Sequence, residues 1–161
     1  MVPRSPAPTA FEAEYLEGFR QIYEEKIVFN RTLGLKLSEI APQGRVTARI
    51  DMRHELVGHF AYNRIHGGVI SAALDAIGSA AVMAALAAKH MEEPPAKRLE
   101  RFAKLGTIDL RIDYLRPGIG EFFTIHAECL RVGSRVGTAR MEFRGPDGTL
   151  MSAGAAAYIV S

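Results

Sequence analysis

A run of 22 residues, from Gly67 to Ala88, contains a single charged side chain, Asp75. No proline interrupts the run, and nine of its residues are alanine, the strongest helix former. The composition predicts one long helix that is apolar on every side, and such a helix must be enclosed by protein or by lipid. A carboxylate in the middle of a membrane-spanning helix is costly. Small side chains instead suit a helix that packs closely against a curved sheet. We therefore expect a protein core and no membrane partner.

The polar side chains of this predicted helix fall on one face. Ser71, Asp75 and Ser79 recur every four residues, which places them one above another. A lone carboxylate on such a stripe needs water, a partner or a substrate. The pattern fits a catalytic carboxylate and a buried structural hydrogen bond to a neighbouring loop equally well.

The predicted start of the helix, His66-Gly67-Gly68, has the features of an oxyanion site. The first N–H groups of a helix lack partners within it, and glycines leave them open to a carbonyl oxygen. A simple tight turn fits the same residues. By helical rise Asp75 lies roughly 12 Å from Gly67, too far for both to touch one carbonyl from the same chain. Joint action would therefore need two copies of the chain, and so a dimer.

These residues also carry a resemblance to a known family. The sequence His66-Gly67-Gly68, six residues and then Asp75, near the start of a long alanine-rich helix, resembles the PaaI-like hotdog-fold acyl-CoA thioesterases. The stretch from Leu105 to Gly118, an aliphatic strand closing on Tyr-Leu-Arg-Pro, is also typical of this group, and the resemblance extends over roughly residues 30–160. It implies an α+β hotdog fold, in which an antiparallel sheet wraps around one long central helix. It also implies a homodimer or a dimer of dimers.

The resemblance implies hydrolysis of an acyl-CoA to free acid and CoA, without a cofactor or a metal. Asp75 would attack the thioester carbonyl or activate water as a general base, and the Gly67 N–H of the opposite subunit would polarise that carbonyl. Ser79, one turn beyond Asp75, could hydrogen-bond the carboxylate or the water. His66 and Gly68 are candidate substrate contacts, and His66 could equally support the turn.

The residue that would position the attacking water differs from the family pattern. Many relatives have Asn or Gln six residues before the histidine of the HGG sequence, whereas this chain has Phe60 there. Asn63, three residues before His66, either replaces that residue or caps the helix.

The rest of the chain predicts a single domain. Residues 1–9, with three prolines, predict a flexible tail, and residues 10–161 a single hotdog domain that begins with an amphipathic helix over residues 10–29. Alternating patterns joined by short turns predict antiparallel strands. The expected strands cover residues 33–40, 45–53, 108–114, 121–131, 135–144 and 150–160, with a loop over residues 54–65.

A short basic helix is expected over residues 96–104. Lys97, Arg101 and Lys104 would share one face, with Arg98 nearby. Because CoA carries phosphates, we take Arg98 and Arg101 as candidate substrate contacts, although an ordinary solvated face fits the same pattern.

Composition argues against several other classes. A net charge of +2, with no basic run interleaved with aromatics, argues against nucleic acid as a partner. The single cysteine excludes an internal disulfide, and the N-terminus lacks an apolar signal core, so we expect a cytoplasmic protein. His54, Glu55 and His59 lack the spacing of a helical HExxH site, which argues against a metal.

Two other functions stay open. A hotdog hydratase or dehydratase needs a histidine base facing a carboxylate, a role that His59 could fill opposite Asp75. A non-catalytic acyl-CoA binding protein would hold the same ligand without turnover. The HGG pattern favours hydrolysis over the first, and the acidic face of the helix over residues 10–29 argues against a DNA-binding regulator.

Overall fold

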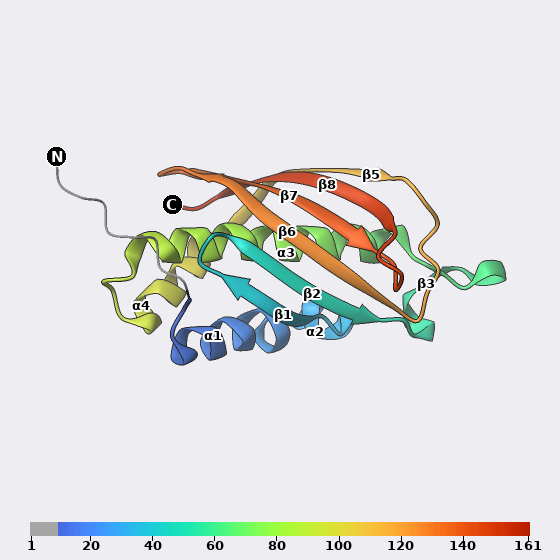
Figure 1. The fold of residues 1–161 in the computed structure, drawn as a ribbon, viewed down its shortest axis with the longest axis horizontal. Coiled ribbons are helices and arrows are strands. Elements are labelled where there is room, and N and C mark those ends of the chain that lie inside the picture. The colour runs from blue at the N-terminus through green and yellow to red at the C-terminus, as the bar shows by residue number, and fades with distance from the viewer. Residues whose placement is uncertain (1–9) are drawn as a thin grey trace.

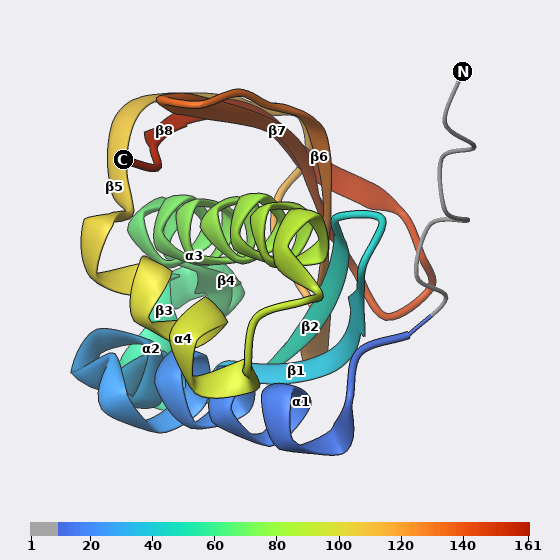
Figure 2. The same ribbon diagram turned by 90° about the vertical axis from the view of Figure 1, so that its left-hand side faces the viewer.

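The computed structural model describes residues 10–161, and the tail predicted for residues 1–9 lies outside the described residues. Its centre is the helix α3, Gly67–Ala87, which one 3₁₀ turn (η4, Ala88–His90) continues. The sheet wraps around this helix, as Figures 1 and 2 show. By length and composition Gly67–His90 could cross a membrane, with a mean hydropathy of 1.9, yet 61% of its most apolar window is buried inside the fold. The predicted central helix is therefore confirmed as a core helix.

Within residues 10–161, six strands form one antiparallel sheet in the order β1-β2-β6-β7-β8-β5. The strand that follows α3 therefore lies at one edge, and the first strand lies at the other. An antiparallel sheet wrapped around one long helix is the hotdog arrangement, so the predicted fold class is confirmed. The strands are β1 (Lys36–Ala41), β2 (Arg45–Asp51), β5 (Gly106–Tyr114), β6 (Phe122–Val132), β7 (Val136–Arg144) and β8 (Leu150–Ile159).

The amphipathic helix expected over residues 10–29 is divided into three pieces and continues further. The pieces are α1 (Ala13–Arg20), the π-helical η1 (Gln21–Lys26) and α2 (Val28–Leu33). Gly34, in the left-handed conformation with φ 72°, ends α2. Because Leu33 is helical, the first strand begins at Lys36 rather than at residue 33.

The segment predicted as a loop, residues 54–65, contains a short hairpin. Its two strands have three and two residues, too few for an alternating pattern to mark them in the sequence. The predicted basic helix after α3 is present as an α-helical and a 3₁₀ segment. These elements are η2 (His54–Leu56), β3 (Val57–His59), η3 (Phe60–Tyr62), β4 (Arg64–Ile65), α4 (Pro95–Glu100) and η5 (Arg101–Lys104).

Small residues let the sheet approach α3 closely. Gly78 of α3 is buried, and a Cβ atom there would lie 2.9 Å from Met141 Sδ and closer still to the Tyr158 hydroxyl. On β7, a Cβ atom at Gly137 would overlap the side chain of Val82. The small side chains of the central helix are thus a condition for the close wrapping of the sheet.

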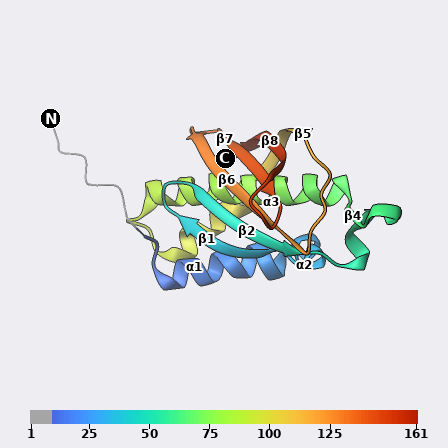
Figure 3. The ribbon, with the colours of Figure 1, turned by 45° about the vertical axis from the view of Figure 1, so that its right-hand side comes forward.

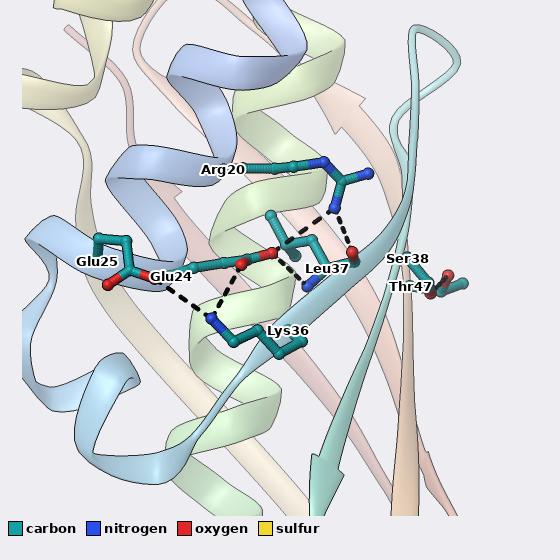
Figure 4. A network of polar contacts seen from close by, with 7 residues as sticks. All are labelled: Arg20, Glu24, Glu25, Lys36, Leu37, Ser38 and Thr47. Atoms are coloured by element: carbon teal, nitrogen blue, oxygen red, sulfur yellow. Dashed lines mark hydrogen bonds and ion pairs between the residues drawn. The ribbon is translucent and has the colours of Figure 1, made fainter.

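Side chains of the N-terminal helical layer cover the outer edge of β1 (Figure 4). Glu24 accepts a hydrogen bond of 2.8 Å from the backbone N–H of Leu37, and Arg20 donates to the Leu37 carbonyl. Lys36 pairs with Glu24 at 3.2 Å and with Glu25 at 3.3 Å. The helical layer therefore satisfies backbone groups that an edge strand would otherwise leave open.

The opposite edge of the sheet, β5, has no such cover. β5 pairs with β8 on its inner side, and within residues 10–161 no side chain bonds to its outer backbone groups. Ile108 and Tyr114 of this strand are 57% and 54% exposed. The sheet thus has one covered edge and one open edge.

Replacing Gly78 with alanine should destabilise the fold by about 1–3 kcal/mol, because the added methyl overlaps Met141 and Tyr158 in a packed core. Helix propensity alone would act in the opposite direction, by about 1 kcal/mol. Urea unfolding followed by circular dichroism measures the difference. Ser71→Ala, at a less buried position of the same helix, is the matched control and should change stability by less than about 0.5 kcal/mol. Equal stability of Gly78→Ala and the wild type would contradict the close packing described here.

Candidate active site

Asp75 lies in α3 and lines a cavity of about 250 Å³. Its Oδ1 atom accepts a hydrogen bond of 2.9 Å from Thr107 Oγ1, at the start of β5. Within residues 10–161 no protein group bonds to the other carboxylate oxygen, which leaves it available to take a proton. The cavity wall is mostly apolar and consists of Ile27, Phe29, Asn30, Ala72, Asp75, Ala76, Ser79, Phe102, Leu105, Gly106 and Thr107.

The Asp75 carboxylate bonds to the neighbouring strand β5, not to a loop, and its catalytic role stays a prediction. The carboxylate makes a hydrogen bond to a neighbouring element and also faces a cavity. Sequence reasoning missed Thr107 as its partner. This residue adjoins an irregularity in the pairing of β5 with β8, between Thr107 and Asp109, and side-chain alternation does not reveal such a shift.

Ser79 lines the same cavity, but its hydroxyl is not bonded to the Asp75 carboxylate. Ser79 Oγ donates to the Ala76 carbonyl at 2.8 Å and lies 3.3 Å from the Tyr23 hydroxyl. Burial raises the pKa of Tyr23 above its ordinary value, so this phenol keeps its proton and can donate to Ser79. A role for Ser79 toward the reacting water is therefore a proposal that the hydrogen bonds leave open.

The start of α3 has one backbone N–H that bonds to no acceptor within residues 10–161. His66 is the N-cap, and its Nδ1 atom accepts a hydrogen bond of 2.8 Å from the Gly68 N–H. The N–H groups of Val69 and Ile70 bond to the His66 carbonyl at 2.9 and 3.2 Å. The Gly67 N–H is the one group of this turn that has no acceptor inside the helix.

These contacts refine the roles predicted for the HGG residues. His66 supports the turn, which was one of its two predicted roles, and an accepting Nδ1 places the ring proton on Nε2. The Gly68 N–H is already bonded to His66, so the predicted substrate contact of Gly68 would not use this donor. Gly67 remains the candidate oxyanion donor, and its carbonyl accepts a hydrogen bond of 3.0 Å from the Tyr114 hydroxyl.

Asn63 and His59 lie away from the Asp75 cavity of their own chain. Asn63 is exposed between η3 and β4, in the left-handed conformation with φ 49°. The prediction that it caps α3 is wrong, because His66 occupies that position. His59, the base expected for a hydratase, is exposed and stacks on Phe60 with ring centroids 6.0 Å apart.

Arg98 is fully buried, so its prediction as a substrate contact is wrong. Its guanidinium pairs with Glu12 Oε1 at 2.6 Å and lies 4.8 Å from the centre of the Tyr15 ring. The Arg98 hydrogen bond lowers the pKa of the Glu12 carboxyl, which keeps that partner charged. Arg98 therefore ties α4 to the N-terminal layer.

Arg101 lines a separate basic cavity of about 670 Å³ at the end of α3. Glu93 holds its guanidinium through contacts of 2.8 and 3.0 Å. His90, Glu92 and Glu93 also place ligand atoms within 4.8 Å of one another. Because Glu93 already binds Arg101, we assign no metal to this cluster. The remaining basic side chains on the wall of this cavity are Lys89, His90, Lys97 and Lys104.

The two candidate catalytic groups lie at opposite ends of β5 in one chain. Asp75 is bonded to Thr107, near the first residue of the strand, and Gly67 is bonded to Tyr114, its last residue. Gly67 lines a different cavity, of about 330 Å³, that does not include Asp75. Asp75 and Gly67 therefore do not meet in one cavity of a single chain.

Comparison with known proteins identifies the family. A sequence model described as the thioesterase superfamily matches residues 62–152, a span that includes Gly67 and Asp75. The chain belongs to the thioesterase superfamily. Relatives in Escherichia coli and Salmonella typhimurium, both named medium/long-chain acyl-CoA thioesterase YigI, are 34% identical over 154 residues. These matches cover 94% of this chain and 96% of each relative.

A solved structure supports the same assignment. A protein from Shewanella oneidensis, described as related to the thioesterase superfamily, has a TM-score of 0.83 and 32% sequence identity. The match covers 94% of this chain and 100% of that chain. The prediction of a thioesterase enzyme with the hotdog fold of this superfamily is therefore confirmed.

Replacing Thr107 with valine should lower kcat of this thioesterase roughly tenfold, because the substitution removes the hydrogen bond that orients the Asp75 carboxylate while keeping the side-chain shape. Thioester hydrolysis followed by release of free thiol measures the change. Thr107→Ser keeps a hydroxyl and should restore most of the activity, which a role in packing alone would not explain. Equal kcat values for the valine and wild-type enzymes would remove Thr107 from the site.

Proposed function

We propose that this thioesterase hydrolyses acyl-CoA esters of apolar acids at a site shared by two copies of the chain. Asp75 of one subunit and the Gly67 N–H of the other would act on the same thioester. The proposal rests on the position of these two groups at opposite ends of the open edge strand β5. The name of the Escherichia coli relative supports the substrate class, and the apolar wall of the Asp75 cavity suits such an acyl group.

The open edge of β5 supports the dimer. Two β5 strands that pair antiparallel about a two-fold axis near the middle of the strand would continue the sheet and remove both open edges. The Thr107 end of one strand would then lie beside the Tyr114 end of the other. Because Asp75 bonds to Thr107 and Gly67 to Tyr114, each carboxylate would face the helix N-terminus of the partner. The dimer would hold two equivalent sites.

The chemistry of the shared site follows from its two groups. The Gly67 N–H would donate to the thioester oxygen and stabilise the negative charge that develops there, an effect typically worth about 10²–10³ in rate. As a general base, Asp75 would accept a proton from water while the water oxygen bonds to the carbonyl carbon. The carbon–sulfur bond then breaks, and the CoA sulfur leaves and takes up a proton. Direct attack by the carboxylate, followed by hydrolysis of the anhydride, uses the same two groups.

No cofactor enters this proposal, because water, a carboxylate and an oxyanion donor are sufficient for thioester hydrolysis. Thr107 holds one oxygen of Asp75, which leaves the other for the proton. The start of α3 adds its positive dipole end to the Gly67 donor.

The basic cavity beside η5 is the proposed site for the phosphates of CoA. Arg101 is held in place by Glu93, and the exposed Lys104 lies on the same wall. By helical rise the end of α3 lies roughly 20 Å from Asp75, a length that an extended CoA arm spans. Arg101 keeps its proposed role in substrate binding, and Lys104 replaces Arg98 in it.

Replacing Asp75 with asparagine should lower kcat by at least about 10²-fold, because the amide keeps the Thr107 contact but cannot accept a proton. Release of CoA from an acyl-CoA, detected with a thiol reagent, measures the loss. Thermal unfolding and sedimentation should match those of the wild type. Retained turnover in a correctly folded variant would refute the role of Asp75.

Replacing Gly67 with proline removes a single backbone N–H, and kcat should fall about 10²–10³-fold. Proline is favoured at the first position of a helix, and the extended backbone of His66, with φ −67° and ψ 136°, suits a following proline. Gly67→Ala keeps the N–H, and its Cβ would meet Tyr114 at an ordinary 3.4 Å. It is therefore the control. Equal kcat values for the proline and alanine variants would exclude the Gly67 N–H as the oxyanion donor.

Replacing Lys104 with glutamate should raise KM for an acyl-CoA roughly tenfold, because a cation that contacts phosphate becomes an anion. The same acyl group carried on pantetheine, which lacks the nucleotide phosphates, is the matched substrate and should keep its KM. A parallel rise in KM for both substrates would show that Lys104 does not contact the nucleotide end.

A further inference from the structure

The hairpin before α3 exposes a cluster of aromatic side chains. We call residues 57–65 the aromatic arm; it consists of β3, η3 and β4. Figures 1 and 3 show that it projects from the body beyond the start of α3. Phe60 at its end is 91% exposed, and Tyr62 is 58% exposed. Grouped exposed aromatics on a projecting element indicate an interaction surface.

The aromatic arm has a defined conformation although the body does not cover it. The His59 ring stacks on Phe60, with ring centroids 6.0 Å apart, and makes a tilted contact with Tyr62, with ring centroids 5.0 Å apart. The Arg64 guanidinium lies 4.6 Å from the centre of the Tyr62 ring. A surface held by its own contacts loses little freedom when a partner binds.

The base of the aromatic arm lies at the end of β5. The Ile65 N–H donates to the Gly118 carbonyl at 2.9 Å, in the segment that follows the strand. The other end of β5 is preceded directly by η5. When two strands pair antiparallel, the segment that follows one strand lies beside the segment that precedes the other. The aromatic arm of one subunit would therefore face η5 of the partner.

The η5 segment has the chemistry to receive these aromatic rings. Phe102 of η5 and the adjoining Leu105 line the Asp75 cavity, which places this segment at the wall of the acyl site. Ala103 is exposed on the same segment. A small exposed residue beside this apolar wall leaves room for an aromatic ring.

We propose that the aromatic arm of one subunit packs on η5 of the other and completes the wall of the acyl cavity there. The inference rests on the shared site proposed above and adds a second contribution from the partner. Each complete site then takes its carboxylate and inner wall from one chain, and its oxyanion donor and outer wall from the other. Phe60 and Tyr62 become determinants of the acyl length that the enzyme accepts.

Cross-linking tests the contact directly. A chain carrying Phe60→Cys and Ala103→Cys, treated with a bismaleimide of short spacer, should form covalent dimers in high yield. Phe60→Cys combined with Glu39→Cys, on the covered β1 edge, is the control and should not form them. Cys129 is partly buried, and burial raises the pKa of its thiol. The wild-type chain, treated in the same way, shows whether this natural cysteine reacts.

Kinetics tests the consequence for substrates. Phe60→Ser together with Tyr62→Ser should lower kcat/KM for the longest acyl-CoA relative to the shortest by roughly tenfold, because the outer wall of the cavity is lost. An absent cross-link together with unchanged chain-length selectivity would overturn the inference. That result would leave the proposed function intact, because the Asp75→Asn and Gly67→Pro variants test that function separately.

Discussion

Two hydrogen bonds between α3 and β5 set the geometry on which the rest of the account depends. Thr107 holds the Asp75 carboxylate at one end of the strand, and Tyr114 holds the Gly67 carbonyl at the other. The helix and the edge strand thus form one unit with a carboxylate at one end and, within residues 10–161, a backbone N–H without an acceptor at the other. This polarity makes a shared site the direct consequence of pairing two such strands.

The two edges of the sheet differ in a way that favours pairing through β5. At β1, Arg20 and Glu24 take up the backbone groups of Leu37, so another strand cannot add there without displacing them. At β5 no described residue covers the outer backbone groups, and exposed apolar side chains lie beside them. A protein that blocks one edge and leaves the other open restricts where a second copy can attach. In the proposed dimer, the N-terminal helical layer would therefore direct assembly as well as covering the core.

Much of the fold could be predicted from the sequence because its periodic signals are strong. The helix from Gly67 is marked by composition alone, and the strands of residues 121–160 by alternation and turn residues. The contacts within the site were harder to predict from the sequence, because they join residues that lie far apart in the chain. Thr107 adjoins a pairing irregularity, and the burial of Arg98 depends on Glu12, 86 residues earlier. The HGG sequence marks a helix start. Only the hydrogen bonds show that the Gly68 N–H is bonded to His66, whereas the Gly67 N–H has no acceptor within residues 10–161.

Co-expression of two inactive variants tests the shared site most directly. Chains carrying Asp75→Asn and chains carrying Gly67→Pro should each be nearly inactive alone. Mixed dimers should regain one intact site, made from the Asp75 of one chain and the Gly67 N–H of the other. Random assembly makes half of the dimers mixed, so activity should return to about a quarter of the wild-type value. A co-expressed mixture as inactive as the separate variants would contradict a site built from two chains.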